Sequence, residues 1–190
     1  MVLRPHYPVE TERLLLRPLV PSDAQAMHAY QRREDVCRYI PYPPRSLADL
    51  QQRLAAPDLT RSSLDESGQA IVLAVVRRSD DILVGDVMLA WTSTEHRTGE
   101  IGYVFNPDYQ GNGYATEACT ALLRLGFDGL RLHRIVARVD ARNTASAAVL
   151  RRLRMREEAH LRENEWFKGE WTDEIDFAIL ESEWRAATPT

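Results

Sequence analysis

One segment, residues 99–118, constrains the fold of this chain more than any other. It reads Gly-Glu-Ile-Gly-Tyr-Val-Phe-Asn-Pro-Asp-Tyr-Gln-Gly-Asn-Gly-Tyr-Ala-Thr-Glu-Ala, which predicts a strand over 100–105, a glycine loop, and a helix that begins at Ala115. Gly111 and Gly113 allow the backbone to turn tightly and leave successive N–H groups unshielded. The helix N-terminus adds unpaired donors and the positive end of the helix dipole. The segment therefore predicts a binding site for an anion such as a phosphate or pyrophosphate.

The loop does not match two well-known phosphate-binding motifs. No Gly-Lys-Ser/Thr follows it, so it is not a Walker A loop. It also departs from the dinucleotide fingerprint, because Thr116 stands at the third glycine position and Arg134, rather than an acid, follows about twenty residues later. On this loop alone, an ordinary turn between a strand and a helix is an equal alternative.

The rest of the chain predicts a mixed α/β fold (α+β in its largely antiparallel first half) with about seven strands and about four helices. Strands are expected at 14–16, 70–77, 82–91, 100–105, 135–139, 158–167 and 174–180. Helices are expected from a Ser22-x-x-Gln25 capping box to about Arg33, from Ser46 to before Pro57, over 115–127, and over 143–155. A loop is expected over 58–68, and a hairpin turn at Lys168-Gly169.

Composition places the chain among folded proteins and suits a single domain, residues 1–190. Its 28 acidic and 24 basic residues leave a net charge of −4, which argues against nucleic acid as a partner of the whole surface. The N-terminus lacks the apolar stretch of a signal peptide, and the longest apolar runs, such as Ala70–Val76, are too short to span a membrane. We therefore expect a cytoplasmic enzyme or binding domain with no membrane partner.

Cysteine and histidine do not predict a metal site. Cys37 and Cys119 are expected to be buried small apolar residues rather than a disulfide. The five histidines are scattered, without a His-Glu-x-x-His pattern or a pair at helical spacing.

The loop and its flanks resemble a known enzyme superfamily. Gln110–Ala115 (Gln-Gly-Asn-Gly-Tyr-Ala) resembles the Gln/Arg-x-x-Gly-x-Gly/Ala motif of the Gcn5-related N-acetyltransferases (GNAT). Thr11–Arg17 (Thr-Glu-Arg-Leu-Leu-Leu-Arg), the Thr-Glu-Ala after the loop, and Asn143-x-x-Ser146 resemble the RimJ/RimL-type branch. The resemblance covers about residues 10–181, and it implies a GNAT-like fold whose fourth and fifth strands splay around the cofactor.

In this superfamily the motif loop binds the pyrophosphate of acetyl-coenzyme A (acetyl-CoA). The resemblance implies this role for Gln110, Gly111, Asn112, Gly113, Tyr114, Ala115 and Thr116.

The strand before the loop pairs with the pantetheine arm, which implies backbone contacts from Tyr103, Val104 and Phe105. The N–H of Val104 or of Phe105 is then the candidate donor to the thioester oxygen, where negative charge develops. The side chains of Tyr103 and Phe105 are expected to pack in the core.

Asn143 and Ser146 resemble the helix pair that contacts the pantetheine and the sulfur, although Asn143 also suits a helix N-cap. Many members place a tyrosine seven residues after this asparagine as the acid for the departing thiolate, but Leu150 stands there in this chain. Ser146 is the remaining donor, and a thiol of pKa about 8.5 can leave with a hydrogen bond alone. Arg154-Met155 replaces the family's Gly-Phe, so the family's helix cap is not predicted here.

A general base is needed because an alkyl amine has a pKa of about 10 and must lose a proton before it attacks the thioester. Glu100 lies where other members place a catalytic glutamate, and Gly102 leaves room beside it. A solvated glutamate at the end of a strand is the alternative interpretation. Glu163, Glu165 and Asp173 are rival bases or amine anchors.

Aromatic residues mark the predicted acceptor side. Tyr39–Pro44 lies where RimJ/RimL-like enzymes wall the acceptor site, so Tyr39 and Tyr42 are candidate substrate contacts. Trp166 and Trp171 are further candidates, within a stretch crowded with acidic residues.

The charge distribution predicts two sides. Acidic residues over 157–176 favour a cationic amine, although a solvated hairpin explains the pattern equally well. An arginine-rich stretch over 131–156 indicates an anionic cofactor on the other side.

The predicted function is therefore an acetyl-CoA-dependent N-acetyltransferase that uses direct attack of a primary amine in a ternary complex. The acceptor is a protein or peptide N-terminus or a small amine. The alternatives are an acetyltransferase of small molecules or antibiotics, and a non-catalytic acyl-CoA-binding module. A homodimer is a further expectation, and no metal is expected.

Overall fold

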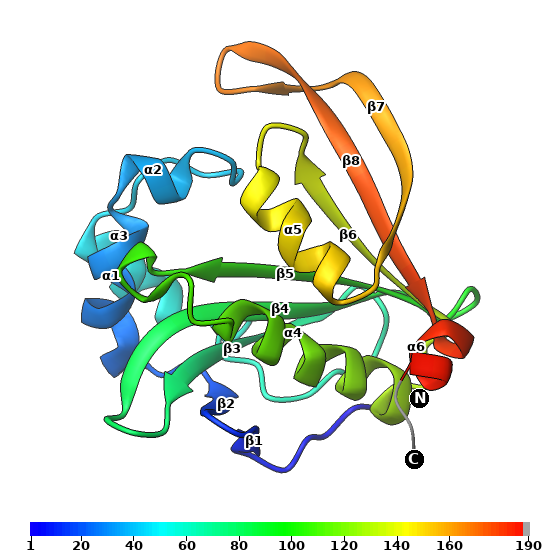
Figure 1. The fold of residues 1–190 in the computed structure, drawn as a ribbon. Helices are drawn as coiled ribbons and strands as arrows, with labels where there is room; N and C mark the ends of the chain where they lie inside the picture. Colours follow the sequence, from blue (N-terminus) through cyan, green and yellow to red (C-terminus); the bar gives the residue numbers. More distant parts are fainter. Residues whose placement is uncertain (188–190) are drawn as a thin grey trace.

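The protein, seen here as a computed structural model that describes residues 1–187, contains one eight-stranded sheet with helices on both faces (Figure 1). The strands are β1 (Val9–Glu10), β2 (Leu14–Pro18), β3 (Ala70–Arg77), β4 (Ile82–Ser93), β5 (Thr98–Phe105), β6 (Arg134–Asp140), β7 (Arg156–Phe167) and β8 (Glu170–Leu180). The helices are α1 (Ala24–Gln31), α2 (Glu34–Cys37), α3 (Leu47–Leu54), α4 (Tyr114–Arg124), α5 (Thr144–Arg152) and α6 (Glu181–Ala187).

The sheet order is β1-β2-β3-β4-β5-β6-β8-β7, and every neighbouring pair is antiparallel except β5 and β6. This confirms the mixed, mostly antiparallel sheet that the sequence predicts. The short strand β1 and the helices α2 and α6 were not predicted. None of the three is long enough to show a periodic pattern, because β1 has two residues, α2 has four and α6 has seven.

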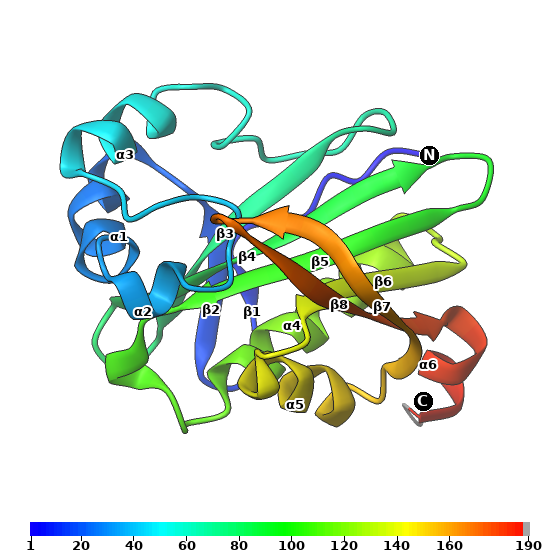
Figure 2. The same cartoon turned by 90° about the horizontal axis from the view of Figure 1, so that it is seen from above.

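Alternation along the strands explains the two layers of helices. In β3, Ile71, Leu73 and Val75 face the core that includes α4, whereas Ala74 and Val76 face a second core with α1 and α3. Because β3 is buried on both faces, its sequence is a nearly continuous apolar run. Figure 2 shows α1–α3 gathered at one end of the sheet and the β7–β8 hairpin crossing above β5 and β6.

Two local predictions are confirmed by hydrogen bonds and dihedral angles. Ser46 caps α3, since its hydroxyl accepts from the N–H of Asp49 (3.1 Å) and the Asp49 carboxylate accepts from the N–H of Ser46 (2.9 Å). Lys168 and Gly169 form the β7–β8 turn with φ values of 49° and 91°. Cys37 and Cys119 are free and buried, as expected.

The start of the first helix differs from the prediction. A 3₁₀ turn covers Pro21–Asp23 and α1 begins at Ala24, so Ser22 does not cap it. Asp23 is the buried residue here, and its carboxylate accepts from the Arg17 guanidinium (2.8 Å) and from the N–H of Val20 (2.9 Å). The polar side chain that stabilises this bend is therefore Asp23, bound by Arg17, and not Ser22.

The most consequential feature of the sheet is a splay between its two parallel strands. β5 and β6 pair only at Thr98, Gly99 and Glu100 of β5, opposite residues 134–136. Beyond Glu100, β5 continues along β4 to Phe105, while β6 continues along β8 to Asp140. The two strands thus diverge, and the backbone edge of residues 101–105 has no strand beside it within residues 1–187. This confirms the predicted splay of these two strands.

No helix in the described part of the chain is both long enough and apolar enough to cross a membrane.

Candidate active site

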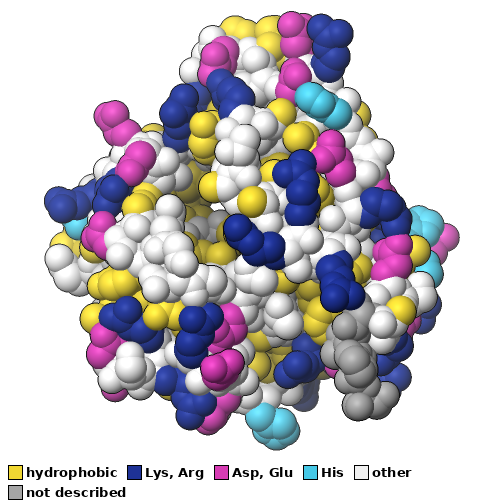
Figure 3. Space-filling model, in the orientation of Figure 1, with side chains coloured by type: hydrophobic (Ala, Val, Ile, Leu, Met, Phe, Trp, Pro, Cys, Tyr) yellow, Lys and Arg dark blue, Asp and Glu magenta, His cyan; other side chains and the backbone are white. Residues whose placement is uncertain are grey.

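The splay opens into a cavity of about 710 Å³. Figure 3 shows its mouth as a hollow with hydrophobic walls between α2 and α5. The predicted site residues that line the cavity are Tyr39, Tyr103, Val104, Phe105, Gln110, Gly111, Gly113, Tyr114, Ala115, Thr116, Asn143 and Ser146. The predicted site residues that do not line it are Tyr42, Glu100, Asn112, Trp166 and Trp171.

The exposed edge of β5 presents the backbone groups of Tyr103 and Phe105 to the splay. The N–H of Asn106 donates to the carbonyl oxygen of Val84 in β4 (2.9 Å), and the β4–β5 register continues unbroken to Val104 opposite Asp86. Successive residues of a strand direct their backbone groups to alternate edges. The N–H and C=O groups of Val104 therefore point toward β4. Tyr103 and Phe105 are directed the other way.

The glycine loop leads directly into α4. Gly111 and Gly113 have φ values of 81° and 78°, in the left-handed region where glycine carries no Cβ penalty. Gly113 is the N-cap residue of α4, and no side chain of the described chain caps this end. The backbone amides of residues 111–116 donate to no acceptor within residues 1–187. The cavity therefore meets a row of unpaired donors at the positive end of a helix.

Asn112 points away from the cavity and stabilises the loop from within. Its side-chain amide donates to the carbonyl oxygens of Tyr109 (3.0 Å) and Gln110 (3.2 Å). Its predicted cofactor contact is therefore confined to its backbone.

The opposite wall of the splay is the N-terminal turn of α5. Asn143 is its N-cap, and the Asn143 side-chain oxygen accepts from the N–H of Ser146 (3.0 Å). The Ser146 hydroxyl lies 2.8 Å from the Tyr103 hydroxyl, which also donates to the Ser146 carbonyl oxygen at 3.0 Å. Tyr103 packs partly against the core as expected, but this polar contact was not predicted. Burial raises the pKa of Tyr103, so its hydroxyl stays protonated.

Two positions that depart from the family pattern have clear structural consequences. Leu150 is fully buried in the core, so it provides no polar group to the cavity. Arg154 adopts a φ of 61°, and the N–H of Met155 donates to the Leu150 carbonyl oxygen (3.0 Å). The helix therefore ends in a left-handed cap although arginine replaces glycine.

Glu100 lies at the point where β5 and β6 separate. One of its oxygens is 3.6 Å from Nη1 of Arg138 on β6, and its side chain is 25% exposed. Gly102 does not leave open space beside it, because a Cβ there would lie 3.3 Å from the methyl group of Met88.

The predicted acceptor aromatics separate into two groups. Tyr39 lines the cavity, whereas the ring of Tyr42 stacks under the Arg45 guanidinium at 3.4 Å. Trp166 and Trp171 form an edge-to-face pair at the hairpin end, with 63% and 58% of their surface exposed. The tryptophans therefore lie outside the cavity, and their acceptor role stays a prediction.

The two charged stretches are not segregated to two sides. Arg134 and Arg156 both pair with Glu158, and Arg151 pairs with Glu157 (2.9 Å). The predicted separation into a basic cofactor side and an acidic acceptor side is wrong, because the two stretches are adjacent in space and pair with each other.

A buried polar cluster beside the cavity was not predicted. Oδ2 of Asp86, opposite Val104 in the sheet, accepts from the Tyr30 hydroxyl (2.6 Å) and from the Gln31 side chain (3.2 Å). Burial raises the pKa of Asp86 to about 6, although these bonds and the charge of Arg45 act in the opposite direction. A lone aspartate in an apolar strand was the only signal in the sequence.

Among residues 1–187, no group of three or more His, Cys, Asp or Glu side chains is placed to hold a metal ion.

Known proteins resemble this chain over nearly its whole length. A family model described as an acetyltransferase (GNAT) domain matches residues 13–156. The uncharacterized N-acetyltransferase YnaD of Bacillus subtilis is 35% identical over 93% of this chain and 98% of that protein. The spermidine N(1)-acetyltransferase of Escherichia coli K12 is 27% identical over 92% of this chain and 90% of that protein.

Solved structures share the fold. An acetyltransferase (GNAT family) from Bacillus anthracis superimposes with a TM-score of 0.79 at 34% identity, over 96% of this chain and 100% of that one. The spermidine N-acetyltransferase from Vibrio cholerae, in complex with CoA and spermine, has a TM-score of 0.76 at 23% identity, over 92% and 99% of the two chains. This second likeness concerns the fold alone.

Proposed function

The chain belongs to the GNAT acetyltransferase family and is an N-acetyltransferase, and from that premise we propose that it transfers an acetyl group from acetyl-CoA to a primary amine. The amine attacks the thioester directly while both substrates are bound. One observation carries this proposal: the open edge of β5 and the unpaired amides of the glycine loop line the same cavity.

The cavity suits this donor in size and in chemistry. Its volume of about 710 Å³ lies within the range of small-molecule sites, roughly 300–1,000 Å³. The amides at the N-terminus of α4 suit a pyrophosphate. The open edge of β5 suits the amide groups of the pantetheine arm, which would lie beside it as an added strand. We assign the pyrophosphate to the backbone of residues 111–116, with Gln110 at the start of the loop.

We assign the thioester oxygen to the N–H of Phe105. The backbone direction along β5 favours Phe105 over Val104, whose groups are directed toward β4. A donor held in a sheet is preorganised for the charge that develops on this oxygen when the amine attacks.

We assign the departing sulfur to the Ser146 hydroxyl, with Tyr103 behind it. Each hydroxyl has one proton to donate. The Tyr103 proton has two acceptors within reach, the carbonyl oxygen and Oγ of Ser146. We assign it to Oγ when acetyl-CoA is bound, which leaves the Ser146 proton for the thiolate. Burial raises the pKa of Tyr103, so the phenol keeps its proton in either arrangement. Ser146 stabilises the thiolate by a hydrogen bond and does not need a tyrosine at position 150.

We assign the proton of the attacking amine to Glu100. Its position at the branch of β5 and β6 and its partial exposure suit a group that takes the proton through a chain of waters. A chain of waters is needed because five residues of strand, about 16 Å, separate Glu100 from Phe105. The rival residues are less well placed. The Asp173 carboxylate already accepts from the N–H of Glu163 and contacts His160, and Glu163 and Glu165 are exposed on the hairpin.

We propose that the acceptor is cationic. The Arg138 guanidinium lies near Glu100 (3.6 Å) and Asp176 (3.8 Å), and Glu174 lies near both of these carboxylates and near Glu165. Burial and the neighbouring charges of Glu165 and Asp176 raise the pKa of Glu174, which indicates an excess of negative charge. An ammonium group would relieve that repulsion.

Two classes of cationic acceptor fit this acidic site. The RimJ/RimL-type motifs favour a protein or peptide N-terminus, and we place the chain in that branch. The spermidine acetyltransferases among its relatives favour a small polyamine as the second candidate. A non-catalytic acyl-CoA-binding module is less well supported, because the chain keeps both Ser146, which lines the cavity, and Glu100, which lies where β5 and β6 separate.

A screen of acceptors tests this function. Purified protein is incubated with acetyl-CoA and either peptides with varied first residues, polyamines, or aminoglycosides, and thiol release is followed. Acetylation of at least one amine class is expected. Binding of acetyl-CoA without thiol release in any arm would instead support the binding module.

Three further expectations belong to this proposal. We propose that the chain works as one catalytic domain and that it acts in the cytoplasm, where free thiols such as Cys37 and Cys119 are usual. A homodimer stays a prediction, and sedimentation of the purified protein tests it.

A further inference from the structure

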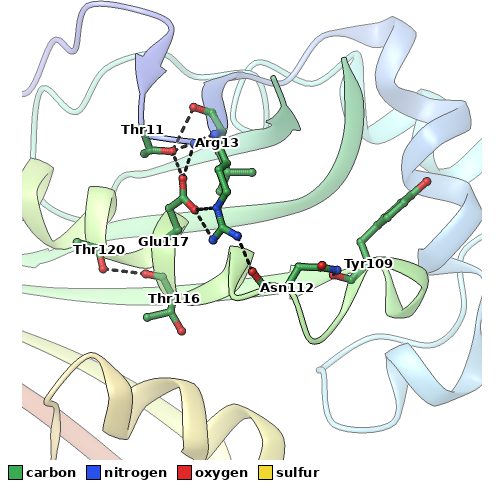
Figure 4. Close-up of polar contacts among 8 residues, drawn as sticks. Thr11, Arg13, Tyr109, Asn112, Thr116, Glu117 and Thr120 are labelled. Carbon is green, nitrogen blue, oxygen red and sulfur yellow. Dashed lines mark hydrogen bonds and ion pairs between the residues drawn. The ribbon is translucent and has the colours of Figure 1, made fainter. Parts of the chain in front are cut away.

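A cluster of polar contacts joins the N-terminal part of the chain to the glycine loop (Figure 4). Glu117, in the first turn of α4, accepts from the Thr11 hydroxyl (2.5 Å), the Arg13 N–H (2.8 Å) and Arg13 Nε (2.7 Å). Nη1 of Arg13 donates to the carbonyl oxygen of Asn112 at 2.9 Å. Arg13 thus bridges α4 and the loop, although it lies 104 positions before Glu117 in the chain.

The bond from Arg13 to Asn112 fixes the orientation of one peptide unit in the loop. A planar trans peptide directs its carbonyl oxygen and its N–H to opposite sides. Holding the Asn112 oxygen toward Arg13 therefore turns the N–H of Gly113 away from Arg13. Gly113 lines the cavity, and its N–H is one of the unpaired donors before α4.

The loop needs such support because of its glycines. Gly111 and Gly113 both adopt φ values that few other residues reach, and glycine loses more conformational freedom on ordering than any other residue. The guanidinium of Arg13 also lies over the Tyr114 ring, 5.0 Å from its centre. The contacts of Arg13 therefore restrain both residues that flank Gly113.

Arg13 acts here by geometry rather than by adding positive charge for a ligand. Its guanidinium is paired with Glu117 at 2.6 Å, and the Glu117 side chain is only 16% exposed. Burial alone would raise the pKa of Glu117, but hydrogen bonds from Thr11 and Arg13 hold it below its ordinary value. The pair therefore stays ionised and close to neutral overall at physiological pH.

We propose that Arg13 and Glu117 are positioning residues that hold the loop amides in place for the diphosphate of the donor. This inference rests on the proposed function. Arg13 and Glu117 would act on the binding of the diphosphate and not on the reaction at the thioester. The loss of Arg13 should therefore weaken the use only of donors that carry a diphosphate. A general weakening of the fold would affect every donor.

Two donors separate these cases. Acetyl-CoA carries the diphosphate, whereas S-acetyl-pantetheine has the same thioester and arm without it. Wild type, Arg13→Gln and Glu117→Gln are compared by kcat and KM with both donors and one amine. We expect KM for acetyl-CoA to rise about tenfold or more in both variants, the effect of losing a hydrogen bond to a charged group. We expect kcat to change less than twofold and kcat/KM for S-acetyl-pantetheine to stay unchanged.

Arg78→Gln is the matched control. The Arg78 guanidinium also bonds the N-terminal segment, at the Thr11 carbonyl oxygen (2.9 Å), but it does not contact the loop. It should leave both donors unaffected. An equal loss of kcat/KM with the two donors, or an unchanged KM for acetyl-CoA in folded Arg13→Gln and Glu117→Gln, would overturn the inference. Failure of the wild type to use either donor would instead refute the proposed function.

Discussion

The hydroxyl of Tyr103 on β5 lies 2.8 Å from Oγ of Ser146 on α5. This contact joins the two walls of the splay. The family's tyrosine is absent from α5, because the buried Leu150 stands at that position. If the half-buried phenol donates to Oγ of Ser146, the serine proton is free for the departing sulfur. The two residues thus form a unit that either substitution disrupts.

Ser146→Ala should lower kcat for acetyl transfer by about tenfold or more, since it removes the donor to the departing thiolate. Tyr103→Phe should lower kcat by a smaller factor, about two- to tenfold, because Ser146 remains but is no longer oriented. The double variant should equal Ser146→Ala alone. Additive losses would show that Tyr103 acts independently. Tyr7→Phe, which removes a hydroxyl bonded to the Ser62 carbonyl oxygen outside the cavity, is the control.

Glu100→Gln should lower the rate more at pH 7 than at pH 9.5. At neutral pH the amine, with a pKa of about 10, needs a base, whereas near its own pKa a larger fraction is already neutral. A full pH profile of kcat/KM for the amine measures this. Glu165→Gln on the exposed hairpin should show no such dependence. An equal fall at both pH values would remove Glu100 as the base.

Asp86 should make the fold less stable as the pH rises. Its pKa is raised from 3.8 to about 6 in the folded protein. The folded state therefore binds the proton more tightly than the unfolded state, and this stabilisation is lost between about pH 4 and pH 6. The free energy of unfolding of Asp86→Asn minus that of wild type should therefore increase by about 2–3 kcal/mol as the pH rises from 4 to 7, because only the wild type loses this stabilisation. Urea unfolding of both proteins measures the difference, and a constant difference across this range would contradict the prediction.

Arg154→Gly should stabilise the protein by about 0.5–1 kcal/mol, since glycine adopts the left-handed cap at a lower cost. The Arg154 side chain is exposed and makes no hydrogen bond or ion pair within residues 1–187, so little is lost. Arg152→Gly, two positions earlier in α5, should destabilise by a similar amount. Thermal unfolding checks both signs, and a lower Tm for Arg154→Gly would refute the account of the cap.

The local parts of the site were predictable from the sequence. The loop at 110–116 combines glycine, a helix pattern and a preceding strand, and each of these acts over a few residues. Ser46 and Lys168-Gly169 were predictable for the same reason, because caps and tight turns depend on neighbours in the chain.

The contacts between distant segments were not predictable. Arg13 with Glu117 and Tyr103 with Ser146 depend on how the sheet places β2, β5, α4 and α5, and a single sequence gives no signal for such pairs. The bend at Pro21–Asp23 shows the limit of local reasoning. Ser22 and Asp23 are both capping residues, and the Arg17 guanidinium, which extends from β2, decides between them.

The charge distribution failed as a predictor for a related reason. Residues 131–156 and 157–176 have opposite charge in the sequence, but Arg134, Arg151 and Arg156 pair with Glu157 and Glu158 of β7. Net charge along a chain therefore indicates a binding surface only after its internal ion pairs are known.

We propose that the cavity between β5, the glycine loop and α5 binds acetyl-CoA. Isothermal titration of the purified protein with acetyl-CoA tests it most directly, with Ser146→Ala as a companion that should bind without efficient turnover. We expect saturable binding to one site per chain in both proteins. An absence of binding at millimolar acetyl-CoA would contradict it.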